Sequence, residues 1–205
     1  KLASGICLVI QRDVIQLAKE VATLDTISKG RFIFGVGAGW NAEEMADHGT
    51  TDFQGRGKLL NERLAALKAI WTGSKPEFHG DLVDFGPMMT WPKPVQKPYP
   101  PIIVGGGFPH GAKRAIAHGD GWMPIGGRLD VVDLLPRFRQ MAAEAGREPD
   151  DIPVTSFGLQ PNSDQVSRTA DAGVDRVVFN LPPEGADTVL PLLDQLTEIA
   201  TKHPE

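Results

Sequence analysis

The sequence has one cysteine, no long apolar run and no basic stretch, and each of these absences excludes a class of protein. Cys7 has no partner for an internal disulfide, which is compatible with a reducing cytoplasm. No run of about 18 apolar residues is present to span a membrane, and no secretory signal pattern is recognisable. Because 21 basic residues stand against 26 acidic ones, for a net charge of −5, nucleic acid is not an expected partner.

Motifs for metal binding and for nucleophilic catalysis are missing as well. The five histidines have neither i,i+4 pairing nor a cysteine or carboxylate at metal-ligand spacing; they are His48, His79, His110, His118 and His203. We therefore expect no metal site formed by the protein. No G-x-S-x-G motif occurs, and Cys7 has no base partner in the sequence, so it is expected to be a small buried side chain.

Glycine and proline are abundant, and their uneven placement divides the chain. The 205 residues, 41% of them hydrophobic, are typical of a single globular domain with one sizeable core. Seven of the 17 prolines lie within residues 76–101, and eight of the 23 glycines lie within residues 105–127. Residues 76–101 are too rich in proline for a central strand, so we expect an excursion over one rim in which residues 82–85 pair as an edge ribbon.

Between these loops, short apolar runs alternate with helical spacing. Strands are expected at residues 6–10, 31–36, 102–104, 122–125, 154–159 and 176–181, and helices at residues 13–28, 58–72, 111–117, 134–145, 164–172 and 189–200. Residues 41–57 are expected to be irregular. Six strands, each followed by a helix, predict a parallel α/β sheet. A (β/α)₈ barrel and a doubly wound open sheet both fit this order, although a complete barrel typically needs about 250 residues and eight units.

The first glycine loop follows the strand at residues 31–36 and reads G-V-G-A-G-W-N over residues 35–41. Alternating glycines let a ligand approach the backbone closely. A dinucleotide-binding loop would read G-x-G-x-x-G and open straight into a helix, so the match to that motif is poor. Two interpretations of this loop stand side by side: a tight turn at the end of the strand, and a loop that binds a ligand. Arg56 and Glu62 are expected either to tie the next helix to this loop by an ion pair or to form a surface pair.

The second and third glycine loops follow the next two strands. Three glycines precede the helix expected at residue 111, and amide groups exposed by glycines at a helix N-terminus form a natural phosphate site. Neighbouring parallel strands place their C-terminal loops side by side, so the two loops are predicted to form one phosphate cradle. His110 is a candidate anion contact, and Arg128 is a candidate charge or a solvated loop residue. The predicted cradle consists of Gly105, Gly106, Gly107, Ile125, Gly126 and Gly127.

Several ordered motifs together resemble the luciferase-like monooxygenase superfamily. Residues 13–41 read DVIQLAKEVATLDTISKGRFIFGVGAGWN, residues 92–107 read PKPVQKPYPPIIVGGG, and residues 119–122 read GDGW. The resemblance covers about the first 125 residues, and the last third matches only in its pattern. Residues 45–91 are similar to the branch of oxidoreductases that depend on the 8-hydroxy-5-deazaflavin coenzyme F420.

This resemblance implies a (β/α)₈ barrel and places the elements within it. The strand at residues 6–10 would be strand three of the barrel, and the strand at residues 176–181 would be strand eight. Residues 1–205 would then form a single partial barrel domain from which the first two strand-helix units are absent. Since two long open parallel edges are unfavourable, we expect the missing segment in the native gene product. The family usually forms homodimers.

The resemblance also implies a cofactor site. The family has a non-proline cis peptide on strand three that backs the ring of the cofactor, and the matching position is Gly5-Ile6. The cofactor phosphate would lie in the cradle defined above. The first glycine loop, with Gly37 and Gly39, would carry Trp40 and Asn41 to the substrate side of the ring. The family's proton donor would lie in the absent segment, so no catalytic residue is assigned.

The expected reaction is hydride transfer between F420 and a small organic substrate, with the cofactor supplying the redox chemistry. An FMN-dependent monooxygenase on the same barrel is the first alternative. A non-catalytic flavin-binding paralogue is an alternative of another class. A sugar-phosphate aldolase or isomerase would also use a glycine phosphate site, but no strand end offers the lysine that such chemistry needs.

Overall fold

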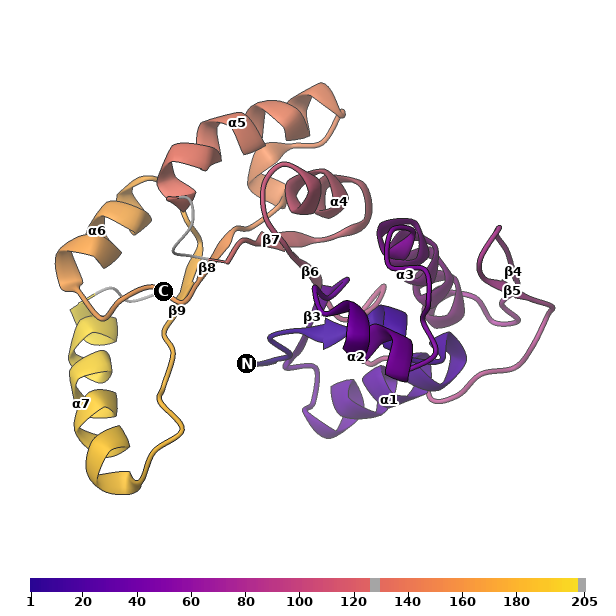
Figure 1. The fold of residues 1–205 in the computed structure, drawn as a ribbon, viewed down its shortest axis with the longest axis horizontal. Coiled ribbons are helices and arrows are strands. Elements are labelled where there is room, and N and C mark those ends of the chain that lie inside the picture. Colours follow the sequence, from indigo (N-terminus) through magenta and orange to yellow (C-terminus); the bar gives the residue numbers. More distant parts are fainter. Residues whose placement is uncertain (126–129, 203–205) are drawn as a thin grey trace.

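The computed structural model describes residues 1–125 and 130–202, in which strands and helices alternate (Figure 1). The sheet strands are β1 (Leu2–Ala3), β2 (Cys7–Leu8), β3 (Phe32–Gly37), β6 (Ile102–Gly105), β7 (Gly121–Met123), β8 (Thr155–Phe157) and β9 (Arg176–Val178). The helices are α1 (Val14–Ile27), α2 (Ala42–Asp47), α3 (Arg56–Thr72), α4 (His110–His118), α5 (Val131–Glu144), α6 (Ser163–Asp171) and α7 (Ala186–Lys202). No helix within these described ranges is long and apolar enough to cross a membrane.

The strands lie side by side in the order of the chain and are all parallel. β1 and β2 are two parts of one strand position, since both pair with β3. β3 pairs with β6 and β6 with β7, and bridges from Trp122 to Val154 and from Ile125 to Phe157 connect β7 to β8, which pairs with β9. A doubly wound sheet would reverse its strand order at a switch point. The sequential order is therefore that of a barrel wall, and in the described residues it is an open arc of six positions.

Two local predictions were wrong. The strand expected at residues 6–10 covers only Cys7–Leu8, and Val9–Gln11 form a 3₁₀ helix with Val9 and Ile10 fully buried. An apolar run reports burial and does not distinguish a strand from a tight buried turn. The stretch expected to be irregular contains α2, because the Oδ1 atom of Asn41 accepts hydrogen bonds from the first-turn amides and caps the helix.

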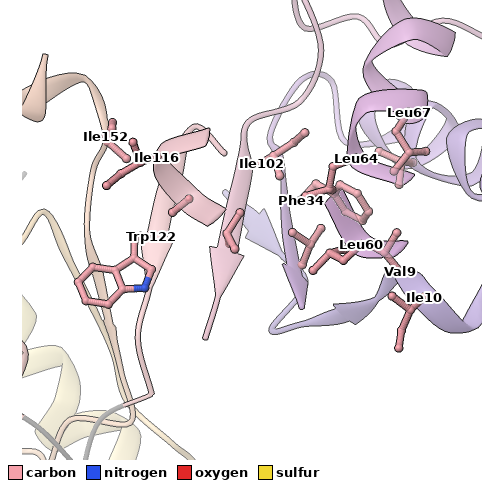
Figure 2. Close-up of a cluster of buried hydrophobic side chains, with 14 of the residues drawn as sticks. Val9, Ile10, Phe34, Leu60, Leu64, Leu67, Ile102, Ile116, Trp122 and Ile152 are labelled. Atoms are coloured by element: carbon pink, nitrogen blue, oxygen red, sulfur yellow. The ribbon is translucent and has the colours of Figure 1, made fainter. Parts of the chain in front are cut away.

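The core has two layers, one on each face of the sheet. Phe34 and Ile102 point toward the helices, where they meet Leu60 and Leu64 of α3 (Figure 2). Alternate residues point the other way, into the concave side of the arc, where Ile33, Ile103 and Met123 form a second cluster with Ile6 and Phe157. Burial on both faces explains the nearly continuous apolar character of β3. The candidate site lies next to this concave cluster, since Ile6 of the cluster contacts β3 and β6 at the ends of these strands.

The proline-rich excursion contains the predicted edge ribbon, and a buried carboxylate helps to tie it to the barrel wall. β4 (Phe78–His79) and β5 (Asp84–Phe85) pair antiparallel, which confirms the ribbon. A later part of the excursion contacts Asp25 of α1, which is fully buried. Its two carboxylate oxygens accept hydrogen bonds from the backbone amide and the side-chain amide of Gln96, at 2.9 and 2.7 Å. The long loop therefore has a polar anchor on the helix layer.

We expect Asp25→Ala to destabilise the protein. The change leaves the backbone amide of Gln96 without its acceptor, and a buried unsatisfied donor costs about 1–3 kcal/mol. We predict a loss of about 2 kcal/mol in the free energy of unfolding, measured by urea denaturation. Asp194→Ala, at an exposed position of α7, is the matched control and should change stability little. Equal stability of the two variants would contradict the anchoring role of Asp25.

Candidate functional site

The site lies at the carboxyl ends of neighbouring parallel strands. Val36 of β3 is in register with Val104 of β6, and Gly105 is in register with Met123 of β7. The loops that follow these strands therefore open on the same edge of the sheet. In the third loop Ile125 is 69% exposed and forms a bridge with Phe157. Gly126, Gly127 and Arg128 lie outside the described residues.

Residues 4–6 form a bulge between β1 and β2, and this bulge lies against the glycines of β3. The Gly5-Ile6 peptide bond in this bulge is cis, as the family resemblance predicts. A side chain at Gly37 would overlap the Cδ1 atom of Ile6, and a Cβ atom at Gly105 would lie only 3.2 Å from the Cγ2 atom of Ile6. A side chain at Gly35 would overlap the backbone carbonyl oxygen of the residue before the bulge glycine, Ser4. These glycines therefore give the bulge room on the concave face.

The first glycine loop leaves β3 through Gly39, whose φ of 72° is in the left-handed region that favours glycine. The Nε atom of Arg56 donates to the carbonyl oxygen of Gly39 at 3.3 Å, and its guanidinium lies 3.8 Å above the ring of Phe53. This contact fixes the loop to the start of α3. Trp40 follows at the rim and is 85% exposed. Asn41 uses its side-chain oxygen to cap α2.

The ion pair expected between Arg56 and Glu62 is not formed. Arg56 instead donates to two backbone carbonyl oxygens, those of Gly39 and Phe53. The carboxylate of Glu62 accepts hydrogen bonds from the backbone amides of Leu82 and Val83, at 2.7 and 3.1 Å. Glu62 therefore holds the β4–β5 ribbon against α3, and the positive charge of Arg56 stays at the site.

In the second glycine loop, both the amide and the carbonyl group of Gly106 form hydrogen bonds within the protein. The amide of Gly106 donates to the carbonyl oxygen of Met123 at 3.3 Å, and the indole nitrogen of Trp122 donates to the carbonyl oxygen of Gly106 at 3.0 Å. Gly106 has a φ of 139°, and a side chain at Gly111 would overlap its carbonyl group. Gly106 and Gly111 are thus needed for the close approach of the loop to the first turn of α4.

Gly107 is different from Gly106, because it faces open space. A Cβ atom at Gly107 would meet no atom within 4 Å. Its carbonyl oxygen accepts a hydrogen bond from the amide of Gly111 at 2.7 Å, while its own amide donates to no group among the described residues. α4 begins directly after this loop, and no described side chain caps it. An uncapped helix N-terminus beside a free amide is a suitable place for an anion.

Basic side chains add positive charge to the same edge. Arg114 on α4 donates from Nε to the Oδ1 atom of Asn61 at 2.8 Å, and its guanidinium reaches the first turn of α3 at Gly57. Burial, together with the neighbouring charge of Arg56, lowers the pKa of Arg114. Within the described residues neither arginine has a carboxylate partner. The electrostatics of the site therefore favour a negatively charged ligand.

Sequence patterns alone missed three residues that shape the site. Ile6 was assigned from the family resemblance, but its packing against Gly37 and Gly105 gave no local signal. Trp122, the last residue of the GDGW motif, is fully buried, and its ring is stacked on Phe138 with 4.7 Å between the ring centroids. Gly111 has a detectable signal, a glycine in the first turn of a helix. Cys7, which was predicted to be a buried side chain, is only half-buried, and this partial burial raises the pKa of its thiol.

Comparison with known proteins connects this fold to characterised enzymes. An uncharacterized protein of Mycobacterium tuberculosis is 36% identical over 198 residues, which is 96% of this chain and 69% of that protein. An F420-dependent glucose-6-phosphate dehydrogenase of Amycolatopsis mediterranei is 31% identical over 141 residues, 66% of this chain and 42% of that protein. An FMNH₂-dependent dimethylsulfone monooxygenase of Pseudomonas putida is 28% identical over 172 residues, 83% of this chain and 47% of that protein.

Solved structures show the same fold. The coenzyme F420-dependent tetrahydromethanopterin reductase of Methanopyrus kandleri superposes with a TM-score of 0.80 at 18% sequence identity, covering 100% of this chain and 83% of that chain. The sequence profile of the luciferase-like monooxygenases matches residues 1–182. The parallel arc of strands is therefore that family's fold, and the chain belongs to the luciferase-like monooxygenase family.

Proposed function

We propose that this protein is an oxidoreductase that binds coenzyme F420 and transfers a hydride between it and a small organic substrate. The observation that carries the proposal is the open amide of Gly107 beside the uncapped N-terminus of α4, at an edge that also holds the positive charges of Arg56 and Arg114. These groups fit a phosphate. When bound, the deazaflavin supplies the hydride chemistry, and the protein supplies binding and orientation.

Each part of the site has a proposed role toward the cofactor. We assign Gly105, Gly106 and Gly107 to the phosphate cradle, with Gly107 as the donor because its amide has no partner among the described residues, and Gly106 as the residue that shapes the turn. The bulge at Gly5 and Ile6 backs the ring, on the concave face. Two sets complete the proposed site: the first-loop residues Gly37, Gly39, Trp40 and Asn41, which line the substrate side, and the third-loop residues Ile125, Gly126 and Gly127, which complete the cradle.

An FMN-dependent monooxygenase is the second candidate. It is favoured by the dimethylsulfone monooxygenase of Pseudomonas putida, which is FMNH₂-dependent and 28% identical. FMN also carries a phosphate, so the cradle alone does not discriminate between the two cofactors. A flavin-binding paralogue without catalysis is the third candidate, and it would bind a cofactor without turning over any substrate.

We further propose that the protein is cytoplasmic and that it forms a homodimer. Sedimentation of the purified protein would test the homodimer.

Titration of the purified protein with both cofactors tests the proposed function. We expect saturable binding of F420, followed by loss of its single visible band when a substrate reduces the oxidised form, or by appearance of that band when a substrate oxidises the reduced form. FMN is recognised by its two-band spectrum and should bind at least tenfold more weakly, a difference of about 1.4 kcal/mol. Tighter binding of FMN would replace the first candidate by the second. Failure to bind either cofactor would refute both.

A further inference from the structure

A cavity lies between two neighbouring helices of the outer layer. α4 and α5 pack side by side on the helix-covered face of the sheet (Figure 1). Between them is a cavity of about 870 Å³, which is within the range of pockets for small organic ligands. Phe108 and Pro109, which follow the glycines of the phosphate cradle, line one end of it, and the rest lies on the outer face along α4 and α5. No role proposed above uses it.

The cavity combines an apolar lining with positive charge. Phe108, Ile116 and Met141 contribute apolar surface, and three basic side chains are matched by one acidic side chain, that of Glu144. This is unusual surface for a chain whose net charge is −5. An isolated pocket of positive charge on an acidic protein attracts anions that the rest of the surface repels.

The three basic side chains are not equivalent, because two of them already have partners. Arg137 forms an ion pair with Glu144 at 3.3 Å. Arg147 donates to the carbonyl oxygens of Ile116 and Gly119, at 3.0 and 2.8 Å, and so closes the C-terminal end of α4. The ammonium group of Lys113 makes no hydrogen bond or ion pair with any described residue. One cation in the cavity is therefore available to a ligand.

We propose that the α4–α5 cavity binds an amphipathic organic monoanion, a carboxylate on an apolar chain, with the carboxylate at Lys113 and the chain against Ile116 and Met141. One available cation calls for one negative charge, and the apolar lining calls for a hydrocarbon body. From Lys113 to its last residue α4 rises by about 7.5 Å, so a chain of roughly six to eight carbon atoms fits along it. The proposal is independent of the cofactor site.

Isothermal titration of the cofactor-free protein with octanoate tests this proposal. Acetate, which lacks the chain, and octan-1-ol, which lacks the charge, should each bind at least tenfold more weakly than octanoate. Lys113→Glu should weaken octanoate binding at least tenfold. Lys75→Glu is the matched control, since it changes the net charge equally at an exposed lysine that does not line the cavity, and should leave binding within twofold.

A second variant obstructs the apolar part of the cavity and keeps the charge. Ala117 lines the cavity on an exposed turn of α4, so Ala117→Trp should occupy the space beside Ile116 and weaken octanoate binding at least tenfold while Lys113 is retained. Circular dichroism confirms that each variant is folded. No octanoate binding at millimolar concentration, equal binding of acetate, or unchanged binding by Lys113→Glu would overturn the proposal.

Discussion

Gly107→Asp should weaken the binding of a phosphate-bearing cofactor at least tenfold, whereas Gly107→Asn should have a much smaller effect. Both side chains have nearly the same shape and enter open space, because a Cβ atom at Gly107 meets nothing within 4 Å. Only aspartate adds a negative charge beside the proposed phosphate. Two like charges about 4 Å apart at an effective dielectric constant of about 20 repel by about 4 kcal/mol, so the effect is expected to lie between tenfold and several hundredfold.

The choice of position decides whether this test is clear. Gly106, with a φ of 139°, does not tolerate a side chain, so Gly106→Asp would mix backbone strain with charge repulsion. Gly107 does not have this problem. The measurement is the dissociation constant for F420 and for FMN in the wild type and in both variants. If Gly107→Asp and Gly107→Asn bind both cofactors equally well, the phosphate does not lie at this loop.

Gly35→Ala should be the most destabilising small substitution at the site. A methyl group at this position would overlap the backbone carbonyl oxygen of Ser4, and Ser4 also donates from Oγ to the carbonyl oxygen of Gly35 at 2.8 Å. A backbone atom cannot rotate away as a side chain can, so either the bulge or its pairing with β3 must shift. Overpacking typically costs about 1–3 kcal/mol, and we expect a loss of about 3 kcal/mol or more in the free energy of unfolding.

The control for this prediction is Gly86→Ala. Gly86 is exposed, a Cβ atom there meets nothing within 4 Å, and its φ is outside the left-handed region. Alanine at such a position restricts the unfolded chain and should leave stability unchanged or raise it by up to about 1 kcal/mol. Urea denaturation of both variants measures the difference. A Gly35→Ala variant as stable as the wild type would mean that the bulge does not press on β3.

The family resemblance predicted the fold and the cis peptide bond, while contacts between distant segments were beyond sequence reasoning. Alternation of short apolar runs with helical spacing predicted parallel strands, and parallel strands place their exits on one edge. The contact between Glu62 and the ribbon at Leu82 joins residues 20 positions apart, and no local pattern reports it. Arg56 was therefore paired with the wrong partner, because charge and spacing along one helix were all that the sequence offered.

The sequence by itself determined the strand-helix alternation, the places of the glycine loops and membership of a family with a phosphate-bearing cofactor. Only the tertiary structure decided which glycine does what. Gly37 makes room for Ile6, the amide of Gly106 is occupied by Met123, and Gly107 alone of these three opens outward. The physical reason is that a glycine specifies only the absence of a side chain. Whether the space is filled by a neighbouring strand, used for a turn or left for a ligand depends on atoms that the chain brings together from elsewhere.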